Sequence, residues 1–439
     1  MFVVYSLLYT LAFILLSPRF LFDVVTGGKY AAGLRQRFGS LPAFSIDERP
    51  VIWLHCVSVG EANAARPLVD GIKQQFPGHR LIVSTTTKTG QSLAKDIFAE
   101  TADAVFYFPF DWRFTVRRSL RHYKPSVILL METEIWFNFI REANHAKARI
   151  AIVNGRLSER SYKRYAYAKQ TMRRVFGYLD LALMQTNADA KRVMSLGIRA
   201  SKVKVGGNLK FDHNVVAQEN DLTGVFRSRF GISADEPLIL ASSTHAPEEK
   251  WLIEAFREIW KTAGERLPRL MIAPRHPERF DEVAKLIKES GFTWVRRSEV
   301  ASARDRNAEI ILLDSIGELR AAYPLAELVF VGGSLISHGG QSIFEPAAAA
   351  RAIITGANTT NFEAAVNEFV TNGAIIQLAK TTDASVVNTL VTAIHDLVKN
   401  ENKRKLLGKN ALAVMSNNRG ATDRTIEYLS PLISSLENR

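Results

Sequence analysis

Short apolar segments alternate with longer amphipathic segments from residue 51 onward. The apolar segments are rich in β-branched residues, and in the first half of the chain they cover 51–57, 81–86, 104–109, 127–132, 150–154 and 181–185. Each is followed by a polar or Ala-rich stretch. Continuous apolar strands that alternate with helices are typical of a parallel sheet covered on both faces. The first half is therefore predicted to be an α/β domain.

The same pattern stops and then restarts near the middle of the chain. A polar stretch, DHNVVAQENDLTGV (212–225), interrupts it. Apolar segments then recur at 237–244, 270–277, 310–315, 328–334, 352–356 and 374–378. This predicts two doubly wound Rossmann-like domains facing a cleft, and no fixed repeat indicates a solenoid. Ligands of such sheets bind at the carboxyl ends of the strands, so the strand-to-loop junctions are where candidate residues are sought.

The N-terminus carries an uncharged apolar run from Phe2 to Leu16, shorter than the ~20 residues of an ordinary spanning helix. No basic segment precedes it and no clear small-residue cleavage site follows, which favours a retained anchor over a removed signal peptide. Arg19, Lys29, Arg35 and Arg37 come after the run, so the body is expected on the cytoplasmic side. Whether the segment spans the bilayer, lies in one leaflet or is a buried core helix stays open.

Charge narrows the choice of partner. The formal net charge is +13, which favours an anionic partner such as nucleic acid, acidic lipid or a phosphorylated small molecule. Seven Lys or Arg residues and one Glu lie between 156 and 174, and five basic residues without an acid lie between 113 and 124. Each cluster is either a solvated helix face or a binding surface. With a hydrophobic anchor in the same chain, an anionic membrane or phosphorylated lipid is the better partner than nucleic acid.

Several common sites are excluded by composition and motif. The hydrophobic fraction of 47% and charged fraction of 23% are those of a globular protein. Cys56 is the only cysteine, so no internal disulfide forms, and the histidines lack the spacing of a zinc site. Neither GxGxxG after the first strand nor a P-loop motif occurs. The nucleotide site, if present, must be built differently.

The first strand ends in HCVSVGE, which places Glu61 at the start of a predicted helix. A carboxylate there can simply favour the helix dipole. The alternative is a general base, because deprotonating an acceptor hydroxyl needs one carboxylate with controlled solvation. The fourth strand ends in METE, where Glu132 and Glu134 would point to the same side if the chain stays extended. Solvent exposure at the strand end is the alternative for that pair, and LKFD then places Lys210 at the domain junction.

The second half offers several weak signals for a nucleotide pocket. Arg275 and His276 follow a strand and suit a phosphate, and Gly317, Glu318 and Leu319 begin a helix whose N–H groups can receive an anion. Glycines at 332, 333, 339 and 340 precede the stretch Ser342, Ile343, Phe344 and Glu345, and allow close approach of backbone to phosphate. Each signal is common by itself, and together they describe a nucleotide pocket.

Longer motifs in the same order resemble one known family. SVGE (58–61), TTTKTG (85–90), METEIW (131–136), NGRLSERSYKRY (154–165), LKFD (209–212), PRHPER (274–279) and GGS with FEPAA are similar to the 3-deoxy-D-manno-octulosonic acid (Kdo) transferases of Gram-negative bacteria. The resemblance runs from the anchor to the C-terminal helices. It implies a GT-B glycosyltransferase that moves Kdo from CMP-Kdo to the lipid A precursor (lipid IVA), with inversion and without a metal, at the cytoplasmic face of the inner membrane.

The resemblance also implies roles for single residues. Glu61 matches the catalytic base, and Glu132 and Lys210 match positions that stabilise the transition state. The CMP contacts match the residues of the predicted nucleotide pocket: Arg275, His276, Gly317, Glu318, Leu319, Ser342, Ile343, Phe344 and Glu345. The family usually reads GGHNPLEPAA where this chain has GGQSIFEPAA, so Gln341 and Ser342 replace His and Asn. That change puts the contact at Ser342 in doubt.

These inferences give a domain plan and two alternatives. The anchor is expected at 1–25, an acceptor-binding domain at 26–210 and a CMP-Kdo-binding domain at 211–439, with the C-terminal helices as candidates to pack back on the first domain. The expected partners are CMP-Kdo, the lipid A precursor and the anionic lipid surface, with no nucleic acid, cofactor or metal. The alternatives are another membrane-associated sugar-nucleotide enzyme, such as an epimerase, and a non-catalytic protein that binds anionic lipid.

Overall fold

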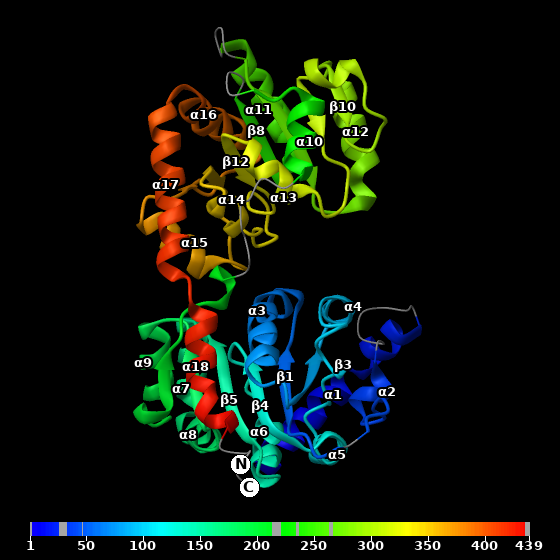
Figure 1. Ribbon diagram of the computed structural model, residues 1–439, viewed down its shortest axis with the longest axis vertical. Helices are drawn as coiled ribbons and strands as arrows, with labels where there is room; N and C mark the ends of the chain where they lie inside the picture. The colour runs from blue at the N-terminus through cyan, green and yellow to red at the C-terminus, as the bar shows by residue number, and fades with distance from the viewer. Residues whose placement is uncertain are drawn as a thin grey trace. The chain divides into compact units, whose positions relative to one another are not determined.

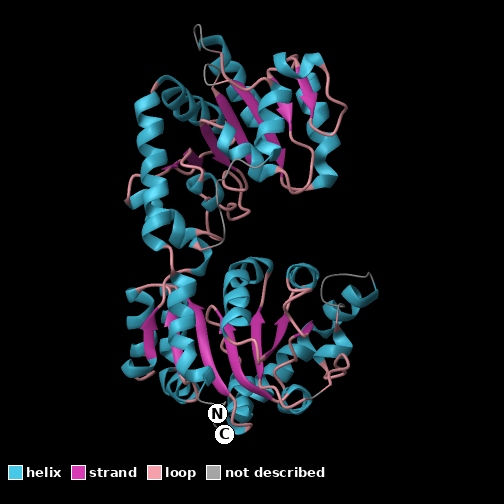
Figure 2. Cartoon of the chain, viewed as in Figure 1, coloured by secondary structure: helices cyan, strands magenta, loops and turns pink. Residues whose placement is uncertain are grey.

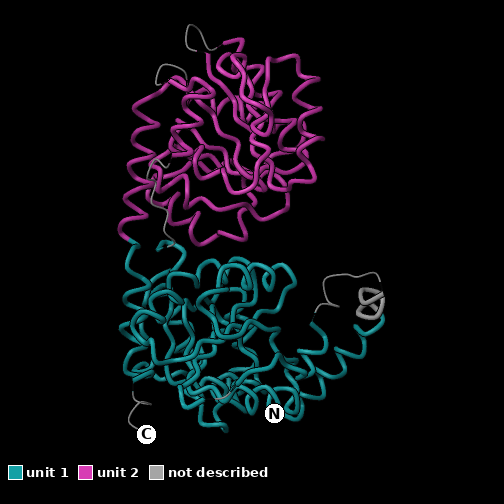
Figure 3. The backbone as a smooth tube through the Cα atoms, turned by 45° about the vertical axis from the view of Figure 1, so that its right-hand side comes forward, with its two compact units in different colours: residues 1–214, 418–439 teal, residues 215–417 magenta. Residues whose placement is uncertain are grey.

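The computed structural model describes residues 2–25, 33–45, 47–212, 221–233, 237–262 and 267–434, with only the main chain over 19–25. The chain forms two compact units, residues 1–214 with 418–439 and residues 215–417 (Figure 3). The predicted donor domain, 211–439, therefore differs from the second unit at both ends. Residues 213–220, which make up most of the predicted polar stretch 212–225, lie outside the described residues.

The first unit is built on a seven-stranded parallel sheet in the order β3-β2-β1-β4-β5-β6-β7 (Figure 1). Its strands are β1 Val51–Cys56, β2 Arg80–Thr85, β3 Ala104–Tyr107, β4 Pro125–Met131, β5 Arg149–Gly155, β6 Leu181–Met184 and β7 Val203–Val205. Alternate residues of the central strands pack into different cores: Trp53 belongs to one cluster, Ile52 and Leu54 to another. Burial on both faces explains why these strands are continuously apolar.

Helices cover both faces of this sheet (Figure 2). They are α1 Phe2–Val25, α2 Leu34–Arg37, α3 Val59–Gln75, α4 Lys88–Ile97, α5 Arg113–Tyr123, α6 Phe137–His145, α7 Glu159–Tyr167, α8 Lys169–Gly177, α9 Asn187–Ser195 and α18 Ala421–Ser434. Helix α18 packs directly on α3. Gly71 permits this contact, because a Cβ at that position would lie 2.2 Å from Ile426 Cδ1.

Helix α1 lies against the first unit along one face. The Tyr5 hydroxyl donates to Asp111 Oδ2 at 2.8 Å, and Thr10 Oγ1 accepts from Trp112 Nε1 at 2.9 Å. The opposite face exposes large apolar side chains, namely Val3, Val4, Leu7, Leu8, Leu11, Ile14, Leu15 and Leu16. Within the described residues, no helix has the length and apolarity needed to cross a membrane.

The basic residues predicted to follow the anchor have different environments. Arg37 is buried, donates to the Thr86 carbonyl and lies over the Tyr107 ring at 4.8 Å. It therefore belongs to the protein interior rather than to a membrane surface. Lys29 lies outside the described residues, and the side chain of Arg19 is likewise not described.

The second unit repeats the construction. Its seven-stranded parallel sheet has the order β10-β11-β9-β8-β12-β13-β14. The strands are β8 Leu238–Thr244, β9 Arg269–Pro274, β10 Trp294–Arg296, β11 Ile310–Leu312, β12 Leu328–Val331, β13 Ala352–Thr355 and β14 Ile376–Gln377. The helices are α10 Asp221–Phe230, α11 Glu248–Thr262, α12 Phe280–Glu289, α13 Leu319–Ala322, α14 Phe344–Ala348, α15 Glu363–Thr371, α16 Val386–Lys399 and α17 Glu401–Asn418. The prediction of two parallel α/β sheets is confirmed.

Candidate active site

Glu61 lies in the first turn of α3, directly beyond the carboxyl end of β1. Ser58 is the N-cap of this helix. Glu61 Oε2 accepts from the backbone N–H of Val57 at 2.8 Å, and Oε1 accepts from the Ser58 hydroxyl at 3.1 Å. This Ser-x-x-Glu arrangement is a form of capping box, so the carboxylate does support the helix start. Its side chain is nevertheless buried, with the residue 7% exposed.

Burial makes the carboxyl of Glu61 a much weaker acid than an ordinary glutamic acid. It raises the pKa of Glu61 to about 8, with the charge of Glu132 as the next cause and Glu134 adding to it. The hydrogen bonds from Val57 and Ser58 act in the opposite direction without cancelling the effect. A general base works best when its pKa is close to the working pH. The environment of Glu61 is thus suited to proton transfer, which a cap alone does not require.

Glu132 follows the last residue of β4 and forms an ion pair. Lys210 Nζ lies 3.1 Å from Glu132 Oε1. Glu132 has a left-handed backbone with φ 54°. Its N–H donates to the Val153 carbonyl at 2.9 Å, so β5 fixes this conformation. The chain turns here, so the extended geometry assumed for Glu132 and Glu134 is wrong. The structure still brings Glu132 to Lys210 and close enough to Glu61 to influence its pKa.

Asn154, at the end of β5, is a neighbour of this group that the sequence did not single out. It also has a left-handed backbone, with φ 54°. Its Oδ1 accepts from the Leu209 N–H at 3.0 Å, which holds the short helical turn carrying Lys210. Non-glycine residues in this conformation concentrate at functional sites. Asparagine before glycine at a strand end was the signal that could have identified it.

In the second unit, Arg275 and His276 follow β9 as predicted. The side chain of Arg275 is exposed, and its N–H donates to the Thr244 carbonyl at 3.0 Å. The ring of His276 lies 5.2 Å from the ring of His245, which follows β8. The loops after two adjacent strands therefore meet at the carboxyl edge of this sheet, where doubly wound sheets bind ligands.

The other predicted nucleotide contacts are mostly engaged within the protein. Glu318 accepts from Arg297 Nη2 at 3.0 Å and from the Ser315 hydroxyl. Helix α13 after it has only four residues. Ser342 Oγ donates to Glu345, and the side chains of Ile343 and Phe344 are buried. A ligand would therefore contact Ile343 and Phe344 through their backbone groups.

Comparison with known proteins decides the family. Residues 32–213 match the family model described as 3-deoxy-D-manno-octulosonic-acid transferase (kdotransferase). A Kdo transferase of Haemophilus influenzae is 33% identical over 411 residues, 93% of each chain. One of Bordetella pertussis is 30% identical over 383 residues, 86% of each chain. The chain belongs to the Kdo transferase family. It is a Kdo glycosyltransferase, and its role lies in lipopolysaccharide synthesis.

Solved structures of low sequence identity support the fold. A UDP-GlcNAc 2-epimerase from Neisseria meningitidis is 13% identical with a TM-score of 0.58, covering 87% of this chain and 100% of that one. A glycosyltransferase from Rickettsia africae is 12% identical with a TM-score of 0.56, covering 90% and 100%. These likenesses show a GT-B-like fold of two Rossmann-type sheets. They do not support the epimerase alternative, because family membership is carried by the Kdo transferases.

Two carboxylates of this Kdo transferase organise the loops of the second unit, and the sequence did not single them out. Glu248 is fully buried and accepts from the N–H groups of His245, Gly333, Ser334 and Leu335 at 2.7 to 3.0 Å. Glu249 is also fully buried and pairs with Arg279 at 2.6 Å. Adjacent acids at a helix start suggest only a dipole interaction. Their actual role is to hold the loops after β9 and β12 against the loop after β8.

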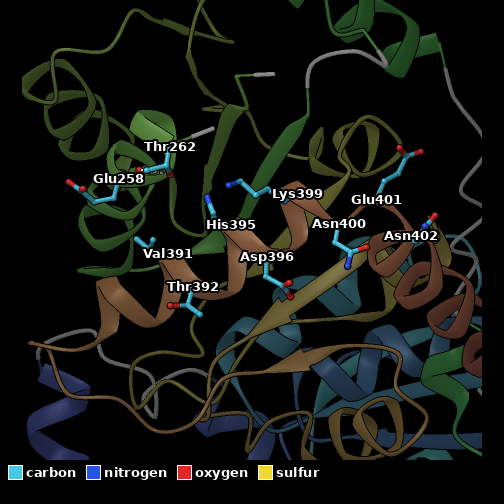
Figure 4. Close-up of a pocket in the computed structure, with 10 residues that line it drawn as sticks. All are labelled: Glu258, Thr262, Val391, Thr392, His395, Asp396, Lys399, Asn400, Glu401 and Asn402. Carbon is cyan, nitrogen blue, oxygen red and sulfur yellow. Dashed lines mark hydrogen bonds between the residues drawn. The ribbon is translucent and has the colours of Figure 1, made fainter. Parts of the chain in front are cut away.

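A depression of about 1140 Å³ in the second unit lies elsewhere (Figure 4). Its lining residues are Glu258, Thr262, Val391, Thr392, His395, Asp396, Lys399, Asn400, Glu401 and Asn402. Those from α11 lie toward its C-terminus, whereas the N-terminus of α11 follows the carboxyl end of β8. The depression is therefore not at the edge where the strands end. Among the residues that the structure describes, no group of three or more His, Cys, Asp or Glu side chains could hold a metal ion.

We predict that Glu132→Gln moves the pH dependence of this transferase to lower pH. The charge of Glu132 raises the pKa of Glu61, so its removal lets Glu61 lose its proton at a lower pH. The acid limb of kcat/KM, which reports the base in the unliganded enzyme, is the measurement. Glu134→Gln is the matched control and should produce a smaller shift, because its influence on Glu61 is weaker. An unchanged acid limb in Glu132→Gln would exclude the electrostatic coupling.

Proposed function

We propose that this enzyme transfers Kdo from CMP-Kdo to the lipid A precursor (lipid IVA) by an inverting, metal-independent reaction. Glu61 is the base, and the Glu132–Lys210 pair stabilises the transition state. The observation that carries the proposal is the buried carboxyl of Glu61, with a pKa of about 8 beside that ion pair. With this pKa the carboxylate form of Glu61 is a stronger base than an ordinary carboxylate, so once it is deprotonated it can accept the proton of an acceptor hydroxyl.

The proposed reaction is a single displacement. An acceptor sugar hydroxyl attacks the anomeric carbon of Kdo while its proton passes to Glu61. The bond from that carbon to the phosphate oxygen breaks, and the electron pair leaves with CMP. One displacement inverts the anomeric centre. Because the donor has one phosphate rather than a diphosphate, cations such as Arg275 and backbone N–H groups are proposed to stabilise the leaving group without a divalent ion.

The proposed location is the cytoplasmic face of the inner membrane, with α1 lying in one leaflet. Its outward face is strongly exposed, with Leu7 at 65% and Leu15 at 71%. Next to α1 is a depression of about 470 Å³ lined by Ser6, Trp112, Arg113, Phe114, Arg117, Arg118 and Arg121. Apolar side chains beside arginines are typical of helices that lie at an anionic membrane surface. Because the other face of α1 contacts the protein, attachment to one leaflet is favoured over spanning.

The test is mass spectrometry of the product made from CMP-Kdo and a defined tetra-acylated lipid A precursor. We expect one or more Kdo residues to be added, and NMR of the product should show an anomeric configuration opposite to that of the donor. The rate should be unchanged by EDTA. Retained configuration would exclude the single displacement, and loss of activity with EDTA that returns with a divalent ion would exclude metal independence. Failure to use this acceptor while another sugar lipid is modified would exclude the proposed acceptor.

A further inference from the structure

Lys210 lies on a single 3-10 turn, Leu209–Phe211, rather than on a strand or a long helix. We call this segment the Lys210 turn. A 3-10 turn is short and has poorer hydrogen-bond geometry than an α-helix, so it does not hold a side chain in place by itself. The ammonium group of Lys210 nevertheless lies 3.1 Å from Glu132 Oε1. Contacts from outside the turn must therefore fix its position.

Asn154 holds the Lys210 turn from the side of the sheet. Its Oδ1 accepts from the N–H of Leu209 at 3.0 Å, and Leu209 is fully buried. The preceding residue, Val153, accepts from the N–H of Glu132 at 2.9 Å. Two consecutive residues at the end of β5 thus contact both sides of the pair between Glu132 and Lys210, although the two partners are 78 residues apart in the chain.

The side chain of Asn154 is directed by its left-handed backbone, which Gln185 stabilises from the end of β6. Gln185 Nε2 donates to the Asn154 carbonyl at 3.1 Å, and the Gln185 N–H donates to the Gly155 carbonyl at 2.8 Å. Asn154 is 1% exposed, and its Nδ2 has no hydrogen-bond partner among the residues that the structure describes. A buried donor without a partner and a left-handed backbone both cost stability, and a glycine would avoid both costs. The contribution specific to Asn154 is therefore the acceptor that it offers to the turn.

Asp212 holds the other end of the Lys210 turn, where it is the C-cap residue. Its Oδ1 accepts from the N–H of Gly420 at 2.7 Å, and its Oδ2 accepts from the N–H of Thr422. Both donors lie at the start of α18. Because α18 packs on α3, whose first turn carries Glu61, Asp212 connects the turn to the helix of the proposed base.

We propose that Asn154 and Asp212 are positioning residues for Kdo transfer, which hold the Lys210 turn so that the ammonium group of Lys210 stays beside Glu132. The inference rests on the proposed role of Lys210 in stabilising the transition state, and neither positioning residue contacts a substrate. A cation stabilises a developing charge most when it is in place before the reaction begins. Misplacement by about 1 Å, caused by a change outside the reacting groups, can lower a rate by about 100-fold.

The first experiment is a double-mutant cycle on kcat. Asn154→Gly keeps the left-handed backbone without strain but removes the acceptor for Leu209, so kcat should fall by about 10- to 100-fold while the affinity for CMP is unchanged. In a Lys210→Ala background the same substitution should change kcat by less than about 2-fold, because no ammonium group is left to position. Asp212→Ala should behave in the same way. Lys147→Gly is the matched control, since Lys147 is exposed in the same unit and has a left-handed backbone with φ 62°.

The second experiment is hydrogen exchange of the backbone amides, which requires no transfer activity. The N–H of Leu209 should exchange at least about 10-fold faster in Asn154→Gly than in wild type, as expected when a buried hydrogen bond is lost. The amides of Gly420 and Thr422 should exchange faster in Asp212→Ala. Amides in the central strands of the sheet should keep their wild-type rates, which separates local loosening from loss of global stability.

The outcomes distinguish this inference from the proposed function. Unchanged exchange at Leu209 in Asn154→Gly would overturn the inference, and so would a loss of kcat of equal size with and without Lys210. If the lipid A precursor proves not to be the acceptor, the exchange experiment still applies, and faster exchange in both variants would support the inference. A Lys210→Ala variant that transfers Kdo at the wild-type rate would overturn both the role of Lys210 and the inference that depends on it.

Discussion

Replacing Glu61 by Gln is expected to lower kcat for Kdo transfer by roughly 100- to 10,000-fold, the range attributed to a lost general base. Gln keeps an oxygen that can accept from Val57 N–H or the Ser58 hydroxyl, so the start of α3 should remain folded. It cannot accept the proton of the acceptor hydroxyl. The measurement is the single-turnover rate with CMP-Kdo and the lipid A precursor, together with the affinity for CMP, which should not change.

The same substitution should make the protein more stable at alkaline pH. The pKa of Glu61 is about 8 in the folded protein and near 4.5 when unfolded. Stability associated with the protonated carboxyl is complete below the unfolded pKa and is lost as pH rises through about 8, since the unfolded chain releases this proton first. The Gln side chain does not titrate, so the variant does not lose this stability as the pH rises. Thermal unfolding should therefore show a gain of a few kcal/mol, at most about 5, near pH 8.5 and little gain near pH 4.5.

Asp70→Asn is the matched control for both measurements. Asp70 is an exposed carboxylate on the same helix, so its replacement removes a charge without changing a buried site. It should leave transfer and the pH dependence of stability unchanged. If Glu61→Gln instead lowers stability at every pH while activity falls in proportion to folded protein, Glu61 is only a helix cap. If transfer is unaffected, the assignment of the base is wrong.

The sequence predicted most of the sheets because their strands are buried on both faces. Each apolar segment predicted as a strand contains one, from β1 to β14, but β7 and β10 were missed. Those two strands form edges and have three residues each. In β7, Lys204 is exposed, and all of β10 is half-buried, so neither shows a continuous apolar run. The exposed or half-buried residues of these two short strands removed the apolar signal.

The candidate sites were predicted less completely because they depend on turns and on loops distant in sequence. Glu61, Glu132 and Lys210 could be located at strand ends, but the left-handed turn at Glu132 was not evident from METE. The contact of His245 with Gln341 joins loops whose residues are 96 positions apart. No local sequence pattern predicts a contact between residues so far apart in the chain.

Helix α1 has one face in contact with the protein and one exposed face, although a single apolar run of the sequence forms both. Its apolar run indicated an anchor, yet Tyr5, Tyr9 and Phe13 recur every four residues and contact the first unit. The remaining residues form the exposed apolar face. A periodicity of aromatic residues within an apolar run is therefore the signal of a helix with one protein-bound face. This arrangement determines which substitutions can test the proposed membrane binding without disturbing folding.

The double variant Leu7→Glu/Leu11→Glu is expected to weaken binding to anionic vesicles by at least about 100-fold, since two apolar side chains are lost from the exposed face proposed to enter the leaflet and two negative charges are added. Leu7 is 65% exposed and Leu11 is 53% exposed, so folding should be unaffected. The measurement is flotation with vesicles containing phosphatidylglycerol. Transfer to detergent-dispersed acceptor should stay near the wild-type rate, while transfer to acceptor embedded in vesicles should fall.

The matched control is Leu406→Glu, which replaces a leucine that is 59% exposed on α17 of the second unit. It should leave vesicle binding unchanged. Arg118→Gln/Arg121→Gln should reduce binding to anionic vesicles but not to neutral ones, and the difference should shrink at high salt, because exposed charges are then screened. If the α1 variant still floats with vesicles as the wild type does, the attachment lies elsewhere in the chain. If it floats less but equally so with neutral and anionic vesicles, and the arginine variant has no effect, α1 binds through its apolar face alone.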